Sequence, residues 1–231
     1  MERVSRTLEL RFKAAVHELR KRKVPFAVAG GLAADLYRRE PRLTMDVDLV
    51  ILTESHGKET GVAVIEALGL RAGIARKADL DGGPLFAIKR RNTEPCMIVG
   101  RSAAKESAEG VDILLPAIPW VKEAVRRAQA NEVDFGFGRI PALTIEDVVL
   151  SKLCALMAAR MRAKDLDDLQ SIFEAGHDVD VPYLAGQMRR LKIIVARAAE
   201  PFLPDTIRQL SRDTVRDSGR LRQISGSKKR L

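Results

Sequence analysis

Two aspartates separated by one valine, Asp46 and Asp48, are the residues of this chain best suited to do chemistry. They begin the apolar run 46–52, which is typical of a buried strand. Because strand side chains return to the same face at every second residue, both carboxylates point the same way. Two neighbouring carboxylates repel each other unless a cation lies between them. The spacing therefore favours a magnesium ion that bridges these carboxylates to substrate phosphates.

A glycine pair, Gly30 and Gly31, precedes the aspartates at the junction between a predicted strand and a predicted helix. Backbone N–H groups at such a junction, together with the positive end of the helix dipole, bind phosphate. Alone, the glycines are more simply a tight turn, and the aspartates alone are more simply the solvent face of an edge strand. Their joint occurrence is what indicates a triphosphate site.

Further charged residues follow at positions that can complete such a site. Asp112 lies within the strand-like run 111–115, and Lys152 supplies a point charge suited to phosphate. Asp165 and Asp168 are three residues apart and so share a helix face. Each also has a purely structural reading, as an exposed strand carboxylate or as a surface ion pair.

These residues carry a resemblance to a known family. The pattern Gly-Gly-x-Ala-x-x-Leu at 30–36, followed by Arg-x-Thr-x-Asp-x-Asp at 42–48, resembles the AbiEii-type nucleotidyltransferases of the DNA polymerase β-like superfamily. Members of this group are toxin components of abortive-infection and toxin–antitoxin systems. The segment 145–169, in which Lys152 is followed by Arg160 and Lys-Asp-Leu-x-Asp-Leu, is similar to a second signature of the family. The resemblance covers 24–52 and 140–173 well, and the middle only through 111–113.

The resemblance implies an α+β nucleotidyltransferase fold, a small mixed sheet with flanking helices, followed by a helical C-terminal part. It also implies an enzyme that moves an NMP from an NTP to an acceptor hydroxyl and releases pyrophosphate, with two Mg²⁺ ions. The third carboxylate of the set is expected to help deprotonate the acceptor. The expected metal ligands are Asp46, Asp48 and Asp112, and the expected catalytic residues are these three with Lys152 and Asp165. The expected nucleotide-binding residues are Gly30, Gly31, Arg42, Thr44, Lys152 and Asp168.

The acceptor is open at this point. The toxin resemblance implies an RNA end, in particular that of a tRNA, and a possible cognate antitoxin as partner. Nucleotidylation of a small molecule or a protein hydroxyl is an alternative, and so is a binding module that keeps the scaffold without turnover. The second glycine stands where serine is common in the superfamily, which removes one hydroxyl contact to phosphate.

The composition sets wider limits. A net charge of +9 suits an anionic partner such as a nucleotide or RNA, although a basic surface can also serve solubility alone. Aromatic residues make up only 4%, which argues against a base-stacking platform. Cys96 and Cys154 are far apart and lack metal-ligand spacing. With no secretion-type segment and no apolar run near the ~20 residues needed to span a bilayer, we expect a cytoplasmic protein without a membrane partner.

The elements that must position these residues can be read from periodicity and breakers. We expect helices at 4–23, 32–39 and 58–68, and strands at 26–29, 46–52, 85–89, 97–99 and 111–115. From Thr144, a predicted N-cap with Asp147 three residues on, helical periodicity runs to about 200 with interruptions at Gly176 and Pro182. We therefore expect a nucleotidyltransferase core at 1–142, a helical region that completes the cleft at 143–217, and a basic, flexible tail at 218–231.

Overall fold

The structure is a computed structural model that describes residues 5–53, 55–76, 95–103, 109–117, 119–157 and 163–212. Its N-terminal elements are α1 (Arg6–Lys21), β1 (Phe26–Val28), α2 (Gly30–Ala34), β2 (Asp46–Ile51), α3 (Gly57–Ala67), β3 (Arg71–Arg76) and β4 (Pro95–Arg101). They are followed by β5 (Gly110–Leu114), α4 (Pro119–Ala128), β6 (Glu132–Asp134), β7 (Arg139–Pro141), α5 (Ile145–Leu156), α6 (Ala163–Glu174), α7 (Val181–Leu191) and the 3₁₀ turn Glu200–Phe202.

The main sheet has five strands in the order β1-β2-β5-β4-β3. The central pair β2 and β5 is parallel, and the other neighbours are antiparallel. Strands β6 and β7 form a separate antiparallel hairpin. A mixed sheet followed by helices confirms the α+β architecture predicted from the sequence.

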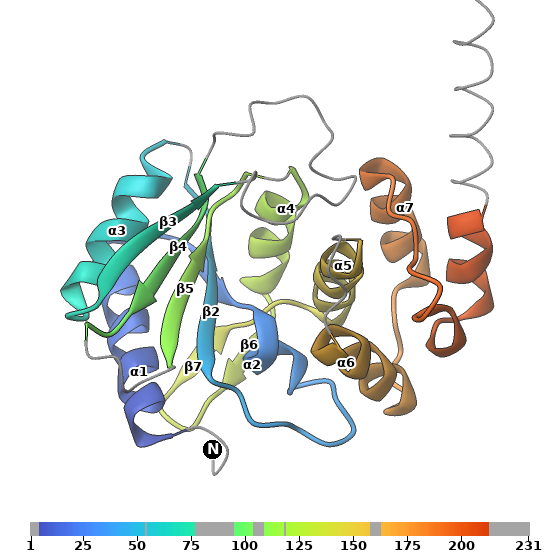
Figure 1. The fold of residues 1–231 in the computed structure, drawn as a ribbon, viewed down its shortest axis with the longest axis horizontal. Helices are drawn as coiled ribbons and strands as arrows, with labels where there is room; N and C mark the ends of the chain where they lie inside the picture. The colour runs from blue at the N-terminus through green and yellow to red at the C-terminus, as the bar shows by residue number, and fades with distance from the viewer. Residues whose placement is uncertain are drawn as a thin grey trace, which may run out of the picture.

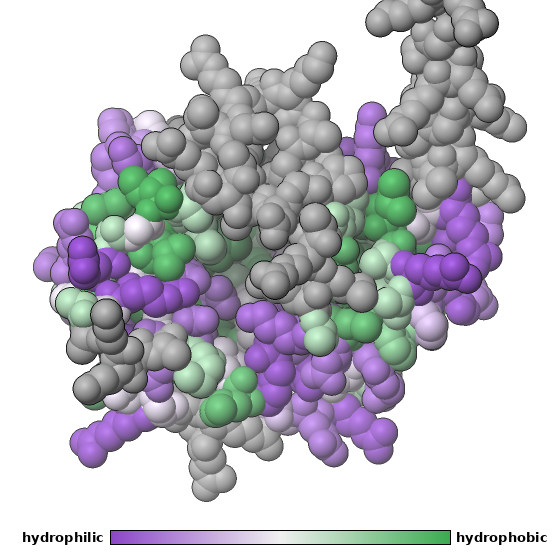
Figure 2. All heavy atoms as spheres, in the orientation of Figure 1, coloured by the Kyte–Doolittle hydropathy of each residue, from purple (hydrophilic) through white to green (hydrophobic). Residues whose placement is uncertain are grey.

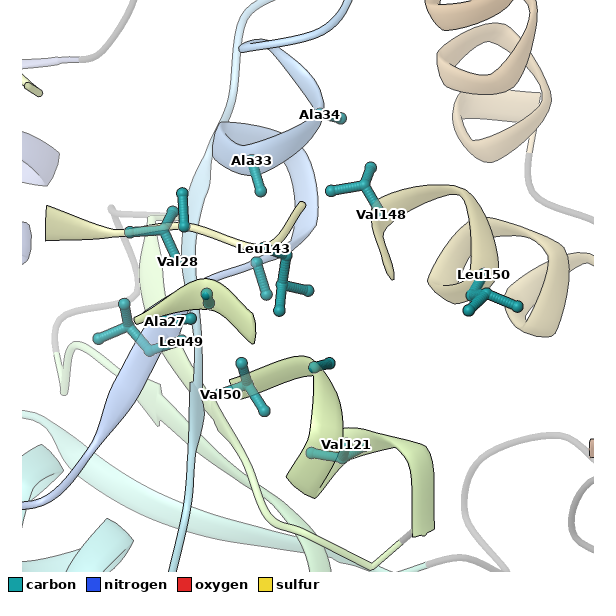
Figure 3. Packing of buried hydrophobic residues seen from close by; sticks show 14 of the residues in the cluster. Ala27, Val28, Ala33, Ala34, Leu49, Val50, Val121, Leu143, Val148 and Leu150 are labelled. Atoms are coloured by element: carbon teal, nitrogen blue, oxygen red, sulfur yellow. The ribbon is translucent and has the colours of Figure 1, made fainter. Parts of the chain in front are cut away.

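Helices cover the two faces of the sheet differently (Figure 1). Helices α1 and α3 pack on one face, against β2, β5 and β4. Helix α4 packs on the other face against β1 and β2, and α5 and α6 lie beyond it on that side. The second face is apolar under α4, where Val50 lies near Val121 (Figure 3). Apolar residues of the neighbouring strands also lie on this face, since Val99 of β4 is the register partner of Asp112.

Helix α1 shows how local sequence signals fix an element. Ser5 caps it by accepting a hydrogen bond from the backbone N–H of Leu8 at 3.1 Å. The residues at helical spacing are buried as predicted, namely Leu8, Phe12, Ala15, Val16 and Leu19. The helix matches the predicted range 4–23 at both ends within two residues.

Small residues allow α2 to approach α5 closely. Ala33 and Ala34 are fully buried, and they lie near Val148 of α5 (Figure 3). This contact joins the helical C-terminal part to the turn that follows β1. It places the Lys152 side of α5 next to the glycine pair.

Some elements differ from those predicted. Helix α2 begins at Gly30 rather than Leu32 and ends at Ala34, because the chain turns at Asp35. Edge strand β3 and the hairpin β6–β7 were not predicted. Their sequences contain charged residues and alternate only weakly between polar and apolar, so the periodicity did not indicate strands. Pro182 does not interrupt a helix but lies in the first turn of α7, where a fixed φ is favourable. The predicted strand 85–89 and the tail 218–231 lie outside the described residues.

The face shown in Figure 2 is mainly hydrophilic, with hydrophobic residues in separate small groups. In the described part of the chain, the large hydrophobic side chains that are exposed are Leu10, Leu43, Met45 and Ile74. No described helix combines the length and the apolar character needed to cross a membrane.

Two helical glycines give a matched test of how tightly α3 packs on the sheet. A Cβ at Gly61 of α3 would lie 2.7 Å from Ile98 Cγ1 of β4, whereas one at Gly186 of α7 would meet nothing within 4 Å. Alanine improves helix propensity at both positions, by up to about 1 kcal/mol. We therefore expect Gly186→Ala to raise the free energy of unfolding by roughly 0.5–1 kcal/mol, and Gly61→Ala to lower it by about 1–2 kcal/mol through overpacking. Urea unfolding checks both, and equal gains would contradict the packing.

Candidate active site

The three predicted carboxylates lie on one face of the sheet. Along β2, Asp46 and Asp48 alternate with Val47 and Leu49, which are fully buried under the opposite helices. Asp48 is the register partner of Asp112 on the parallel neighbour β5. Partners in register on adjacent strands point to the same side, so the side chains of all three face α5 and α6 rather than α1 and α3.

The glycine turn lies directly against this acidic face. Gly30 has φ +58°, a conformation that side chains other than glycine rarely adopt, and a Cβ there would overlap the carboxylate of Asp48. A Cβ at Gly31 would lie 3.0 Å from Thr44 Oγ1 and 3.1 Å from the guanidinium of Arg42. Glycine is therefore required at position 30, and position 31 leaves little room for a side chain.

The electrostatics of this face call for a cation. Burial raises the pKa of Asp48 to about 6, and the negative charge of Asp112 contributes in the same direction, while Lys152 opposes the shift. Burial also raises the pKa of Asp46, against the opposite effect of Arg101. Burial thus makes the ionised forms of Asp46 and Asp48 less favourable, and a cation bound beside them would offset that cost.

Arg101, at the end of β4, is a residue of the site that the sequence analysis missed. Its guanidinium donates to both oxygens of Asp112, at 2.5 and 3.1 Å, and lies 3.6 Å from Asp46 Oδ1. The prediction of a strand at 97–99 came within two residues of it. However, no local signal indicates that this strand pairs with β5, and that pairing is what brings Arg101 to Asp112.

Two of the three carboxylates fit a divalent cation. Asp46 Oδ1 is buried and has no hydrogen-bond partner, and Asp48 lies beside it on the same strand face. Oxygen donors of this kind suit Mg²⁺, which keeps waters and substrate phosphates among its ligands. Within the described residues, no group of three or more His, Cys, Asp or Glu side chains could hold a metal ion.

Lys152 lies in a buried ion-pair network between α5 and α6. Its ammonium is 3.0 Å from Asp165 Oδ1 and 2.7 Å from Asp168 Oδ2, and both carboxylates are fully buried. Both aspartates thus pair with Lys152 inside the protein, whereas the structural alternative placed them in ion pairs at the surface. An ammonium has three donors, and these contacts use two.

Asp168 also binds two arginines near the glycine turn. Arg42 donates to both of its oxygens, at 2.8 and 3.1 Å, and Arg38 donates at 2.7 Å. Although burial opposes the shift, the hydrogen bonds from Arg42 and the charge of Lys152 lower the pKa of Asp168 to about 2. Asp168 is therefore held ionised, and it ties the loop before β2 to α6.

Asp35, directly after α2, supports this loop. It accepts hydrogen bonds from the backbone N–H of Arg42 at 3.2 Å and from Thr44 Oγ1 at 3.5 Å. Thr44 also lies against Gly31, where it can steady the glycine turn. Arg160 of the second signature lies outside the described residues.

A second buried cluster fixes the start of α5. Arg127 binds Glu146 at 2.7 Å and lies 3.3 Å from Asp147, which accepts a hydrogen bond from Tyr183 at 2.8 Å. Thr144 takes the N-cap position as predicted, but its hydroxyl donates to Asp147 rather than capping the helix. This cluster joins α4, α5 and α7 and so holds the helix that carries Lys152.

The comparison with known proteins agrees with this geometry. The sequence profile of the family described as nucleotidyl transferase AbiEii toxin, type IV TA system, matches residues 18–224. The chain belongs to this family. It is a nucleotidyltransferase, and membership of a type IV toxin–antitoxin family implies an NTP substrate and an antitoxin partner. The fold and the resemblance predicted from 24–52 and 140–173 are thereby confirmed.

Several solved structures are similar to the chain at low identity. They include JHP933 from Helicobacter pylori, with 15% identity, TM-score 0.45 and coverage of 94% of this chain and 96% of that one. An antigenic nucleotidyltransferase-like protein from Paracoccidioides brasiliensis has 14% identity, TM-score 0.45 and coverage of 83% and 95%. The antibiotic-resistance factor ANT(2'')-Ia has 15% identity, TM-score 0.43 and coverage of 94% and 96%. No curated protein sequence matches the chain.

The raised pKa of Asp48 predicts a gain in stability when its charge is removed. The folded chain binds more protons than the unfolded chain between about pH 4 and 6, so the free energy of unfolding falls as pH rises through that window. In EDTA at pH 7.5 we expect Asp48→Asn to stabilise the chain by roughly 2–3 kcal/mol, from a shift of about two pKa units. This gain in the free energy of unfolding should become smaller as the pH falls to 4.

Urea unfolding at both pH values measures this gain. Asp178→Asn, at an exposed carboxylate between α6 and α7, is the matched control and should change little at either pH. A metal-free Asp48→Asn chain that is less stable than the parent at pH 7.5 would contradict the prediction.

The Lys152 network predicts a large structural cost when its cation is removed. Lys152→Met leaves Asp165 buried without this partner. We expect the free energy of unfolding to fall by roughly 3–5 kcal/mol, the cost of breaking a buried ion pair. Lys164→Met, at an exposed neighbouring lysine, should change stability by no more than about 0.5 kcal/mol. Thermal or urea unfolding distinguishes the two, and similar stabilities would show that Lys152 is not needed to balance the buried acids.

Proposed function

We propose that this enzyme transfers an NMP from an NTP to the hydroxyl at an RNA end, with tRNA as the favoured acceptor, in a Mg²⁺-dependent reaction. The observation that carries the proposal is the contact between the glycine turn and the first acidic strand. Gly30 lies so close to Asp48 that a triphosphate on the turn adjoins a cation at the carboxylates. Phosphate and metal are thus presented as one site, as phosphoryl transfer requires.

The chain's own groups have distinct roles in this proposal. The first N–H groups of α2, at Gly30 and Gly31, bind phosphate oxygens, because a helix start leaves such donors without intrahelical partners. Lys152 directs its remaining donor to the triphosphate, and Asp165 and Asp168 hold that ammonium in place. Arg42 and Thr44 keep the turn closed from the side of the loop.

Asp46 and Asp48 hold Mg²⁺, which when bound neutralises negative charge that develops on the phosphates during transfer. The acceptor oxygen forms a bond to the α-phosphorus, and the bond from that phosphorus to the bridging oxygen breaks to release pyrophosphate. A carboxylate of the acidic face, which includes Asp112, takes the proton from the acceptor hydroxyl.

The proposal of RNA as acceptor is supported by charge. The chain carries a net charge of +9, which favours a polyanionic acceptor over a neutral small molecule. Both NTP and tRNA are available in the cytoplasm, where we place the enzyme. Residues 1–142 then form the nucleotidyltransferase core, and 143–217 complete the cleft through Lys152 and the aspartates of α6.

Labelling with each α-³²P-NTP in turn tests the proposal. With Mg²⁺ and total RNA, we expect RNase-sensitive label from one or more NTPs, together with pyrophosphate release. Asp46→Ala/Asp48→Ala should reduce the label at least 100-fold, in line with loss of the electrostatic stabilisation that the ion supplies. Asp178→Asn should label RNA as the parent does, and the labelled fraction should fall steeply with salt.

The other outcomes identify the alternatives. Label that resists RNase but is lost on protease treatment, or that migrates with small molecules, would replace RNA by another acceptor. NTP binding without any transfer would indicate a non-catalytic module. Equal labelling by the parent and the double variant would remove the proposed mechanism.

A further inference from the structure

Arg101 occupies a defined position on the acidic face. In the sheet, Gly110 of β5 has Arg101 of β4 as its register partner on one side and Asp46 of β2 on the other. Residues in register share a face, so the Arg101 side chain starts beside Gly110 on the acidic side. From there its guanidinium reaches Asp112, two residues further along β5.

The strand is built to accept this guanidinium. A Cβ at Gly110 would overlap Arg101 Nη1 and lie 2.7 Å from its Cζ. The guanidinium also donates to the backbone oxygen of Gly100 at 3.0 Å, which fixes its orientation. A planar fork that meets both oxygens of a carboxylate is the strongest geometry for such a pair. The Arg101 guanidinium thus lies over Gly110, half-exposed but held by hydrogen bonds to Asp112 and to the backbone.

The negative charges of the face are unequally matched as a result. Asp112 has both oxygens hydrogen-bonded to Arg101 and is almost completely buried. Asp46 lies 3.6 Å from the same guanidinium, which is too far for a hydrogen bond, and its buried Oδ1 has no such partner. The unmatched charge thus lies on β2, at Asp46 and Asp48.

From this arrangement we propose that Arg101 takes the place of a second metal ion, so that the site binds one divalent cation, at Asp46 and Asp48. Asp112 then serves to hold Arg101 and not to bind metal. Arg101 is part of the chain and lies 3.6 Å from Asp46, so its positive charge is already at the site when the ion and the substrate bind. This inference rests on the proposed Mg²⁺-dependent function, and it revises the expectation of two ions drawn from the family resemblance.

Counting bound Mn²⁺ by EPR titration of the whole chain tests the proposal without reference to activity. The parent should bind one Mn²⁺, and Asp112→Asn should change its Kd by less than about threefold. Asp48→Asn should raise the Kd at least tenfold. Arg101→Gln should bind a second Mn²⁺, because Asp112 then lacks its cation.

Two further variants serve as controls, one for misfolding of Arg101→Gln and one for the loss of an arginine elsewhere. Gly110→Ala keeps every charge but displaces the guanidinium, so it should also gain a second ion even if Arg101→Gln fails to fold. Arg139→Gln removes an exposed arginine of the hairpin, which pairs with Glu132, and should bind one ion as the parent does.

The results that would contradict the role of Arg101 differ from those that would contradict the proposed function. Two ions on the parent, with the second lost in Asp112→Asn, would overturn the role of Arg101 and leave the proposed function intact. A single ion on folded Arg101→Gln and Gly110→Ala would overturn it as well. No Mn²⁺ on any variant, even with an NTP analogue present, would contradict the metal-dependent function itself.

Discussion

The acidic face of the central strands imposes the main constraint on this molecule. Asp46, Asp48 and Asp112 share one side of a sheet whose other side is packed with fully buried aliphatic residues. Carboxylates brought this close together and partly removed from water oppose one another's ionisation. The fold must therefore provide positive charge around them, and this need explains many of the contacts in the surrounding structure.

Cations from different parts of the chain meet this constraint. Arg101 comes from β4 and pairs with Asp112, while Lys152 comes from α5 and opposes the burial that raises the pKa of Asp48. Lys152 is itself balanced by Asp165 and Asp168, and Asp168 in turn binds Arg42 from the loop before β2. Because each charge has its counter-charge nearby, the site is a connected network and not a set of independent residues.

This connection has a consequence for how the residues of the site are interpreted. Buried ion pairs contribute little net stability, but breaking one leaves a charge without a partner and is costly. Lys152 and Asp168 therefore position neighbouring groups and also maintain the fold, and a loss of activity on mutation does not separate the two roles. Asp46, whose buried oxygen lacks a hydrogen bond, is a better indicator of ligand binding.

The sequence by itself determined the elements whose signals are local. The alternation at 46–52, the apolar stripe of α1 and the glycine pair were sufficient to predict β2, a helix and the turn, since each depends on neighbouring residues. The motif spacing also indicated the family. The boundaries of α2 were less accurate, because Asp35 ends it through contacts with residues seven to nine positions later.

Tertiary structure alone decided which strands lie side by side and which charges meet. The pairing of β4 with β5 brings Arg101 to Asp112, and the packing of α5 on α6 brings Lys152 between two aspartates. Neither contact can be predicted from the neighbouring residues, because an arginine at a strand end or a lysine on a helix is equally stable when it is exposed to solvent. Pairings between residues far apart in the chain depend on the free energy of the whole fold, so they appear only when the chain is folded.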